Sequence, residues 1–399
     1  MAAVQIAENI YWVGVVDWNV RNFHGHTYTT NHGTTYNAYL IIDEKITLVD
    51  TVPSVFADEL IANIRSVIDP AKITYLIANH VEMDHSGALP RIHKLVSAVK
   101  VYGTKNCKDG LQKHYYIDNL DFTAVKSGDS LKLGKRSITF LEAPMLHWPD
   151  SMFSYIPEDA LLLPNDAFGQ HFASAARFND EVDECVLMRE AEKYYANILW
   201  PFSALVLKKI ADVQGMNIPI KMIAPSHGVI WRTAPERIIQ LYTQWAQNKA
   251  EGKKVVVLYE TMWGSTERMA RSMVEGLFAA GITAQLCDIN ASDRSEIITD
   301  LLSAQGILIG SSTHDNDMLP NLAGFLEIMK GLKMKNRRAA VFGSYGWGGG
   351  AIKEIEGVLK EAGIETVLPS LGVRYVPSPI ELQQCVDFGS AFAKTIDIL

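Results

Sequence analysis

The stretch Asn79-His80-Val81-Glu82-Met83-Asp84-His85 directly follows an apolar run, Ile73 to Ala78, with the composition of a β-strand. Residues two apart at the end of a strand point the same way, so His80 and Glu82 can reach one metal ion. Asp84 and His85 come from the turn that follows and can reach a second ion. The stretch therefore predicts a two-metal site at the end of a strand.

Three later positions have the same character, because each follows a strand-like run, where active-site loops usually lie. A single histidine is more often a structural or surface residue than a ligand, but so dense a cluster favours metal binding. The three positions are His147 in Met145-Leu146-His147-Trp148-Pro149-Asp150, Asp166 in Pro164-Asn165-Asp166-Ala167-Phe168 and His227 in Pro225-Ser226-His227-Gly228.

The length of 399 residues predicts two domains, since single hydrophobic cores usually stop growing at roughly 250 to 300 residues. The polar stretch from Gln247 to Lys254 is followed by the apolar run Val255 to Tyr259, so we place the boundary at residue 250, between domains 1–250 and 251–399. In the first domain, short strands with few helices between them predict packed sheets with helices outside. In the second, alternating strands and helices predict a parallel doubly wound sheet.

The pattern of the second domain is regular enough to name its elements. Further strands are expected at Thr283–Asp288, Gly306–Gly310 and Ala339–Gly343. In the first helix, apolar residues recur every four positions, as one buried face would require. They are Met269, Met273 and Leu277 with Ala270, Val274 and Phe278.

Three loops of the second domain follow predicted strands, where ligands of such sheets bind. Their hydroxyls and backbone N–H groups can wrap a phosphate, and they match neither a Walker A loop nor a G-x-G-x-x-G loop. Trp263, Tyr345 and Trp347 offer flat surfaces for a flavin ring, although they could instead belong to an interface. The candidate residues are Thr261, Met262, Trp263, Gly264, Ser265 and Thr266; Ser312, Thr313, His314, Asp315 and Asn316; and Ser344, Tyr345, Gly346, Trp347, Gly348 and Gly349.

The H-x-E-x-D-H stretch and the three later ligand positions resemble the flavodiiron branch of the metallo-β-lactamase superfamily, and the three loops resemble a flavodoxin that binds FMN. The resemblance covers essentially the whole chain. It implies a metallo-β-lactamase-like αββα sandwich followed by a flavodoxin-like sheet. It also implies FMN and two iron ions as cofactors, with His80, Glu82 and His147 on one iron, Asp84, His85 and His227 on the other, and Asp166 and an oxo or hydroxo group bridging them.

Glu82 distinguishes this pattern from the hydrolytic members, which typically carry a second histidine at that position. Four imidazoles and three carboxylates make a harder, more anionic site that suits iron and redox chemistry better than zinc. By the same resemblance, His24, His171 and Tyr195 in the segments NFHG, FGQH and KYYAN are candidate catalytic residues that position ligands or supply protons. Ordinary packing is an equal alternative for each of the three.

The resemblance implies an oxidoreductase in which reduced FMN passes electrons to the di-iron centre, which reduces dioxygen to water, nitric oxide to nitrous oxide, or both. Rubredoxin or reduced coenzyme F420 is the expected external donor, because no rubredoxin-like CxxC pair follows the second domain. A head-to-tail homodimer or a dimer of dimers is expected. The ligand set does not separate the two substrates, since both would use the same residues.

Two alternatives stay open. One is a zinc-dependent hydrolase of the metallo-β-lactamase type with an accessory flavodoxin-like domain, against which Glu82 and the flavin loops count. The other is a flavodoxin-like electron carrier fused to an inactive metal domain, which the complete set of seven ligands disfavours.

Charge and composition exclude several partners. The net charge of −8 disfavours nucleic acid and anionic membranes. The N-terminus MAAVQIAENIYW lacks the features of a secretory signal, and no apolar run approaches the roughly 18 residues of a membrane span, so a cytoplasmic protein is expected. The cysteines form no CxxC pair and are expected to be reduced and buried; they are Cys107, Cys185, Cys287 and Cys385.

Overall fold

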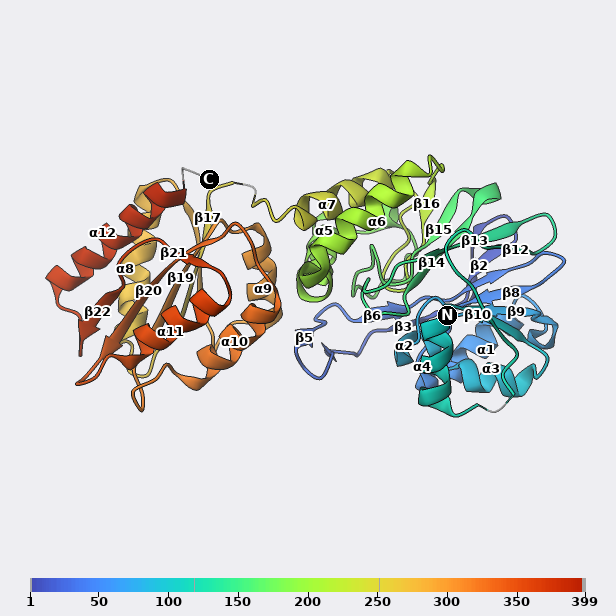
Figure 1. Ribbon diagram of the computed structural model, residues 1–399, viewed down its shortest axis with the longest axis horizontal. Helices are drawn as coiled ribbons and strands as arrows, with labels where there is room; N and C mark the ends of the chain where they lie inside the picture. The colour runs from blue at the N-terminus through green and yellow to red at the C-terminus, as the bar shows by residue number, and fades with distance from the viewer. Residues whose placement is uncertain (1, 118, 251, 397–399) are drawn as a thin grey trace. The chain divides into compact units, whose positions relative to one another are not determined.

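The computed structural model describes residues 2–117, 119–250 and 252–396. The chain divides into two compact units (Figure 1). One comprises Met1–Tyr195 and Ala204–Thr243, and the other comprises Ala196–Ser203 and Gln244–Leu399. Within the described residues, no helix combines the length and the apolar character needed to cross a membrane.

Two sheets stacked face to face form the centre of the first unit. Apolar side chains from both sheets, such as Trp12, Ile77, Phe140 and Met152, meet in the core between them. The first sheet has the order β1 (Val4–Ala7), β2 (Ile10–Trp12), β7 (Tyr39–Ile41), β8 (Thr47–Val49), β9 (Tyr75–Ile77), β10 (Lys100–Gly103) and β11 (Phe122–Ala124). The second has the order β12 (Ser130–Lys132), β13 (Ser137–Glu142), β14 (Met152–Ile156), β15 (Leu161–Leu163) and β16 (Met222–Ile223).

Helices cover the outer faces of both sheets (Figure 1). Helices α1 (Ala57–Arg65), α3 (Leu89–Leu95) and α4 (Lys105–Tyr115) pack on the first sheet through a second apolar core. Helices α5 (Glu184–Tyr194), α6 (Ser203–Gly215) and α7 (Glu236–Ala246) lie along the other sheet. The result is the helix–sheet–sheet–helix sandwich predicted from the sequence.

The strand directions bring distant segments to one edge of this sandwich. Strands β8, β9 and β10 run parallel, and so do β15 and β16. The carboxyl ends of parallel strands meet at the same edge of a sheet. The segments that hold His80, Asp166 and His227 follow β9, β15 and β16, and His147 lies in the connection from β13 to β14.

A parallel sheet forms the second unit, in the order β18 (Thr283–Asp288), β17 (Lys254–Glu260), β19 (Gly306–Ser312), β20 (Arg338–Tyr345) and β21 (Glu365–Thr366), with β22 (Leu371–Arg374) also on β20. Helices α8 (Ser265–Ala279) and α12 (Pro379–Ile396) cover one face. Helices α9 (Arg294–Ser303), α10 (Pro320–Gly331) and α11 (Gly350–Glu361) cover the other (Figure 1). The four predicted strands and the doubly wound arrangement are confirmed.

Two expectations about burial were wrong. Phe278 does not belong to the buried face of α8, since its side chain is 79% exposed, while Met269, Met273 and Leu277 are buried. Phe278 stands nine residues after Met269, a rotation of about 900°, so its side chain points to the opposite side of the helix from the buried Met269. Cys185 is exposed in the first turn of α5, whereas Cys107, Cys287 and Cys385 are buried as expected, and all four are free thiols.

Candidate metal centre and flavin site

The seven predicted metal ligands meet in the first unit as two adjoining groups. Within each group the ligand atoms lie within 4.8 Å of one another. One group holds His80, Glu82, His147 and Asp166, and the other holds Asp84, His85 and His227. Segments from four different parts of the chain thus converge on a site large enough for two metal ions.

Asp166 connects the two groups, because each of its carboxylate oxygens faces one of them. Its Oδ1 lies 3.1 Å from Nε2 of His85 and 3.5 Å from Nε2 of His227. Its Oδ2 lies 3.4 Å from Nε2 of His147 and 3.6 Å from Nε2 of His80. This arrangement is the one that a carboxylate bridging two metal ions requires.

Glu82 and Asp84 each complete one group. Oε2 of Glu82 lies 3.3 Å from Nε2 of His80 and 3.2 Å from Nε2 of His147. Oδ2 of Asp84 lies 3.2 Å from Nε2 of His227, and its Oδ1 lies 3.4 Å from Nε2 of His85. All four imidazoles therefore present Nε2 to the carboxylates, which leaves Nδ1 to face the surrounding protein.

Several of these atoms fit a metal because they are buried polar atoms without a hydrogen-bond partner in the described parts of the chain. They include Oδ1 of Asp84, Nε2 of His85 and Oδ2 of Asp166. Buried polar atoms are normally satisfied, so such a concentration needs an explanation. Imidazole and carboxylate donors pointing at one another are explained by cations between them.

The protonation of the cluster leads to the same conclusion. Burial lowers the pKa of His80, but hydrogen bonds to Asp150 and Glu82 outweigh it and raise the pKa to about 10. His147 behaves alike, with the Asp166 and Glu82 carboxylates raising its pKa to about 10 against the effect of burial. Without metal, the carboxylates therefore hold protons on the imidazoles. Two divalent cations would take the place of these protons as the positive charge between the carboxylates.

The protein fixes the ligands through their outer atoms. Nδ1 of His80 lies 3.1 Å from Oδ2 of Asp150, which also accepts a hydrogen bond from the backbone N–H of Val81 at 2.7 Å. Nδ1 of His227 donates to the carbonyl of Thr35 at 2.7 Å. Such partners set the tautomer and direction of a metal-binding imidazole, leaving Nε2 for the metal.

Asp50, which follows β8, ties two ligand segments together. Its carboxylate accepts hydrogen bonds from the backbone N–H of Asn79 at 2.8 Å, from Nδ2 of Asn79 at 3.1 Å and from Nδ2 of Asn165 at 3.3 Å. Asn79 directly precedes His80, and Asn165 directly precedes Asp166. One buried carboxylate thus holds the residues that directly precede His80 and Asp166.

The three candidate catalytic residues lie in different surroundings. His24 is partly exposed, with Nε2 3.5 Å from Oε1 of Glu82. His171 is buried, with Nδ1 2.8 Å from Oγ1 of Thr34 and its ring 4.8 Å from that of His227. Burial and the neighbouring His227 and His24 charges lower the pKa of His171, so the ring is neutral. Tyr195 packs its ring on that of Tyr242, 5.1 Å away.

Tyr194 is the tyrosine of this segment that reaches the metal ligands. Its hydroxyl donates a hydrogen bond to Oδ1 of Asp166 at 3.0 Å, as the hydroxyl of Ser226 also does. Successive helical side chains point about 100° apart, so the KYYAN motif alone does not tell which of its two tyrosines faces the site. Asp50, Asp150 and Tyr194 were all missed, although Asp150 stands in the same quoted segment as His147.

A cavity of about 370 Å³ opens beside Asp84. Side chains of Phe23, Tyr36, Met83 and Tyr115 are among those that line it, and His24 stands at its wall. The lining is largely aromatic and apolar.

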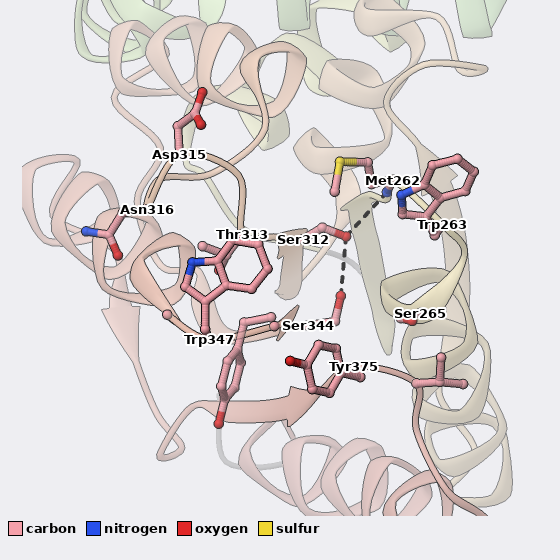
Figure 2. Close-up of a pocket in the computed structure, with 14 residues that line it drawn as sticks. Met262, Trp263, Ser265, Ser312, Thr313, Asp315, Asn316, Ser344, Trp347 and Tyr375 are labelled. Atoms are coloured by element: carbon pink, nitrogen blue, oxygen red, sulfur yellow. Dashed lines mark hydrogen bonds between the residues drawn. The ribbon is translucent and has the colours of Figure 1, made fainter.

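The second unit contains a cavity of about 650 Å³, which residues of all three predicted loops line. Figure 2 shows Trp263 and Trp347 on different sides of it, with Ser312 and Ser344 between them. None of the described lining residues is a lysine or arginine. Its volume and aromatic walls fit a flavin ring.

Three hydroxyls form a connected group beside this cavity: Ser312 and Ser344 line it, and Thr266 is buried next to them. Oγ1 of Thr266 lies 3.0 Å from Oγ of Ser312 and 2.9 Å from Oγ of Ser344, and the two serine oxygens are 3.3 Å apart. Gly264 precedes α8 with φ of 83°, a conformation that side chains rarely adopt. Hydroxyls at a helix N-terminus suit the phosphate of FMN without a basic residue.

The sequence missed a fourth segment of the wall. Tyr375 and Val376, directly after β22, line the cavity. The guanidinium of Arg374 lies 5.1 Å from the centroid of the Tyr375 ring and donates to the carbonyl of Gly346 at 2.9 Å. The short strand Leu371–Arg374 followed by an aromatic residue was the available signal. Five of the candidate flavin residues are not among the described residues that line the cavity: Thr261, Gly264, Thr266, His314 and Gly349.

Residues 34–228 match the ODP family beta lactamase, and residues 257–389 match the flavodoxin family. A curated relative, the nitric oxide reductase of Moorella thermoacetica, is 51% identical over 98% of both chains. The anaerobic nitric oxide reductase flavorubredoxin of Escherichia coli is 42% identical over 98% of this chain and 82% of its own length.

Solved structures agree over the whole chain. The rubredoxin oxygen:oxidoreductase from Desulfovibrio gigas superposes with a TM-score of 0.97 at 38% identity, covering 99% of each chain. The flavodiiron protein from Giardia intestinalis superposes with a TM-score of 0.96 at 33% identity, covering 100% of this chain and 97% of its own.

Fold and sites together define a two-domain metalloflavoprotein: a metallo-β-lactamase-like sandwich followed by a flavodoxin domain, as predicted. The relatives make the assignment specific, and the chain belongs to the flavodiiron protein family. The fold and the family expected from the sequence are therefore confirmed, and the oxidoreductase reading is favoured over the hydrolase.

Proposed function

We propose that this protein is a flavodiiron oxidoreductase that reduces nitric oxide to nitrous oxide, dioxygen to water, or both. The observation that carries the proposal is the cluster of four imidazoles and three carboxylates, with Asp166 facing both groups, in the same chain as a flavin-sized cavity. Relatives named for each reaction support it: nitric oxide reductases at 51% and 42% identity, and an oxygen oxidoreductase at 38%.

The ligand assignment follows from this proposal. His80, Glu82 and His147 would hold one iron, Asp84, His85 and His227 would hold the other, and Asp166 would offer one carboxylate oxygen to each. Bound iron would supply open coordination positions and electrons for a diatomic molecule, and bound FMN would supply further electrons. Glu82 makes the site harder than a histidine would, which favours iron over the zinc of the hydrolase alternative.

The chain's own residues prepare the metal site. Asp150 and the carbonyl of Thr35 keep Nε2 of His80 and His227 directed inward, while Ser226 and Tyr194 hold one oxygen of Asp166. Phe23, Tyr36 and Tyr115 form an apolar approach that a diatomic gas can enter. His24, beside Glu82, is placed to exchange protons near the mouth of this approach.

The flavin site is assigned to the three predicted loops with Tyr375 and Val376. The Thr266, Ser312 and Ser344 hydroxyls and the start of α8 would hold the phosphate, and Trp263, Tyr345, Trp347 and Tyr375 would surround the ring. Electrons would come from an external donor, rubredoxin or reduced coenzyme F420. We place the protein in the cytoplasm as a head-to-tail homodimer or a dimer of dimers.

The test is made under anaerobic conditions with protein loaded with iron and FMN. A donor in excess reduces the protein, and calibrated electrodes compare the consumption of nitric oxide with that of dioxygen. Fast loss of either gas supports the proposal and ranks the substrates. Loss of neither gas, or a purified protein that holds zinc and hydrolyses esters or lactams, would contradict it.

A further inference from the structure

Asp315 is the only charged side chain among the described residues that line the flavin cavity. The other polar groups of the lining are mainly hydroxyls, backbone groups and the amide of Asn316. Asp315 lies on the same side of the cavity as Trp347 and across from Trp263 (Figure 2), and its side chain is 87% exposed. The described rim of the cavity therefore carries one negative charge and no positive charge.

The backbone holds Asp315 in a tight turn directly after β19. His314 and Asp317 exchange two backbone hydrogen bonds, of 3.0 and 2.9 Å, and the residues between them, Asp315 and Asn316, have φ of 51° and 63°. A two-residue loop in which both residues have positive φ is a type I′ turn, which favours Asn and Asp. The turn also packs tightly on the start of α11, since a Cβ at Gly350 would lie 1.8 Å from the carbonyl oxygen of Asn316. The backbone thus gives Asp315 a defined place at the rim.

The neighbours of the Asp315 carboxylate leave its charge largely uncompensated. Its Oδ2 lies 3.3 Å from Nδ1 of His314, whose side chain is 51% exposed. Exposed ion pairs contribute little, and a neutral imidazole does not offset a carboxylate at all. No lysine or arginine pairs with Asp315 in the parts of the chain that the structure describes.

The charge of a flavin ring changes when the ring takes up electrons. The oxidised ring is neutral, whereas two electrons and one proton give a reduced ring with one negative charge at neutral pH. A carboxylate beside the ring repels this negative charge and hardly affects the neutral oxidised ring. Reduced FMN is then bound less tightly than oxidised FMN, and this difference lowers the reduction potential of the flavin.

We propose that Asp315 lowers the reduction potential of bound FMN and so makes the flavin a stronger electron donor to the iron centre. The proposal rests on the oxidoreductase function proposed above. Asp315 acts only through its charge: it forms no bond to the flavin and transfers no proton. The electrons come from the external donor and leave for the irons, and the proton taken up on reduction is released on reoxidation.

The decisive variant is Asp315→Asn, because asparagine suits the positive φ of the turn and keeps the size of the side chain while removing its charge. The midpoint potential of FMN is measured without oxygen at pH 8, in the full chain loaded with iron and FMN, against dyes of known potential. We expect affinity for reduced FMN to rise roughly fivefold relative to oxidised FMN, which raises the two-electron potential by about 20 mV. Affinity for oxidised FMN alone, measured by fluorescence, should stay unchanged.

A second variant and the salt concentration separate charge from structure. Asp315→Lys reverses the charge, so the potential should rise by about twice as much as in Asp315→Asn. Both shifts should shrink as ionic strength rises from about 0.01 M to about 1 M, because the Debye length falls from about 30 Å to about 3 Å. A disturbed turn would not show this dependence on salt.

The matched control is Asp387→Asn, which makes the same change of charge on α12. Asp387 is exposed, accepts a hydrogen bond from Nε2 of Gln383 at 3.1 Å, and is not among the described residues that line the cavity. Its variant should have the potential of the wild type.

A wild-type potential in both Asp315 variants would overturn the proposal, as would an equal shift in Asp387→Asn or shifts that do not depend on salt. A chain that shows the expected shifts but consumes neither gas would instead overturn the oxidoreductase function, and the effect of Asp315 on the flavin would stand.

Discussion

The metal site and the flavin cavity are built in opposite ways, although both lie where strands end. In the metal site four of the seven candidate ligands are buried, the other three are only partly exposed, and hydrogen bonds hold them in place; His80 is 0% and Asp166 is 1% exposed. In the flavin cavity the walls are open and aromatic; Trp263 is 89% and Trp347 is 93% exposed. Its polar groups are mainly hydroxyls, backbone and the amide of Asn316, and Asp315 is the only charged side chain among the described lining residues.

This difference predicts how each site responds to substitution. In a buried site, removing one charged or hydrogen-bonding group leaves its partners unsatisfied, which is costly. On an open wall, a lost side chain forfeits contact area and little else. Changes in the metal site should therefore have large effects on iron, and changes in the flavin cavity should have smaller effects on FMN.

Asp166→Asn should have the largest effect. The substitution keeps the size of the side chain but removes the charge that faces both metal groups, so iron affinity should fall beyond the roughly 100-fold loss seen when outer hydrogen-bond partners are removed. Iron per chain and FMN per chain, measured on one preparation, check this. Normal iron content would show that Asp166 does not bridge, and lost FMN would show that the sites are not independent.

Asp150→Asn tests whether the hydrogen bonds that hold the ligands contribute as much to iron affinity as the contrast between the two sites predicts. His80 loses the carboxylate that its Nδ1 meets, so iron affinity should fall roughly 10- to 100-fold. Competition with a chelator of known affinity measures it. Asp159→Asn is a suitable control, because Asp159 pairs with Arg136 at 2.7 Å and does not belong to the metal site. Equal losses in both variants would point to general destabilisation.

The predictability of the two sites from sequence follows the same contrast. All seven candidate ligands are brought together, because metal ligands cluster in short segments at strand ends. Asp50 and Tyr194 were missed, since they act from distant segments through hydrogen bonds that only the fold creates. In the flavin cavity, the three loops after strands were foreseeable from the alternation of strands and helices, but Tyr375 was not, because its strand is only four residues long.

Iron binding to the apoprotein should depend on pH in a direction set by the buried histidines. Burial lowers the pKa of His85, but the Asp84 and Asp166 carboxylates raise it to about 9, while the pKa values of His80 and His147 are about 10. Iron binds only neutral imidazole, so it must displace these protons. Apparent affinity should rise with pH about tenfold per unit for each proton displaced.

The stability of the apoprotein should change in the opposite direction. A histidine whose pKa is raised by folding adds stability that is complete below its unfolded value and is lost as pH rises through the folded value. The metal-free protein should therefore lose stability as pH rises toward about 9 to 10. Anaerobic iron titrations with proton release, and denaturant unfolding of apoprotein at several pH values, measure the two trends. An iron affinity that does not change with pH would contradict the prediction that the histidines of the cluster are protonated in the apoprotein.

Thr266→Val tests the hydroxyl group beside the flavin cavity. Valine keeps the shape of threonine, but Ser312 and Ser344 lose the oxygen that connects them, and the phosphate loses a hydrogen-bond donor. FMN affinity should fall about tenfold, the effect of one hydrogen bond worth roughly 1 to 1.5 kcal/mol. Fluorescence titration of apoprotein with FMN measures it, and titration with riboflavin, which lacks the phosphate, is the control that should change less.

Trp347→Leu should have the smallest effect. It tests whether the aromatic wall of the flavin cavity contributes to the stability of the fold or only to the binding of FMN. Because the Trp347 side chain is 93% exposed, its removal should leave the unfolding free energy of the apoprotein unchanged within about 0.5 kcal/mol. An aromatic contact with the flavin is worth roughly 0.5 to 1.5 kcal/mol, so the dissociation constant of FMN should rise about fivefold, and Trp347→Phe should restore most of it. Unchanged affinity would mean that Trp347 does not touch the ring. A large loss of stability would mean that this wall is as tightly built as the metal site, and the contrast between the two sites would fail.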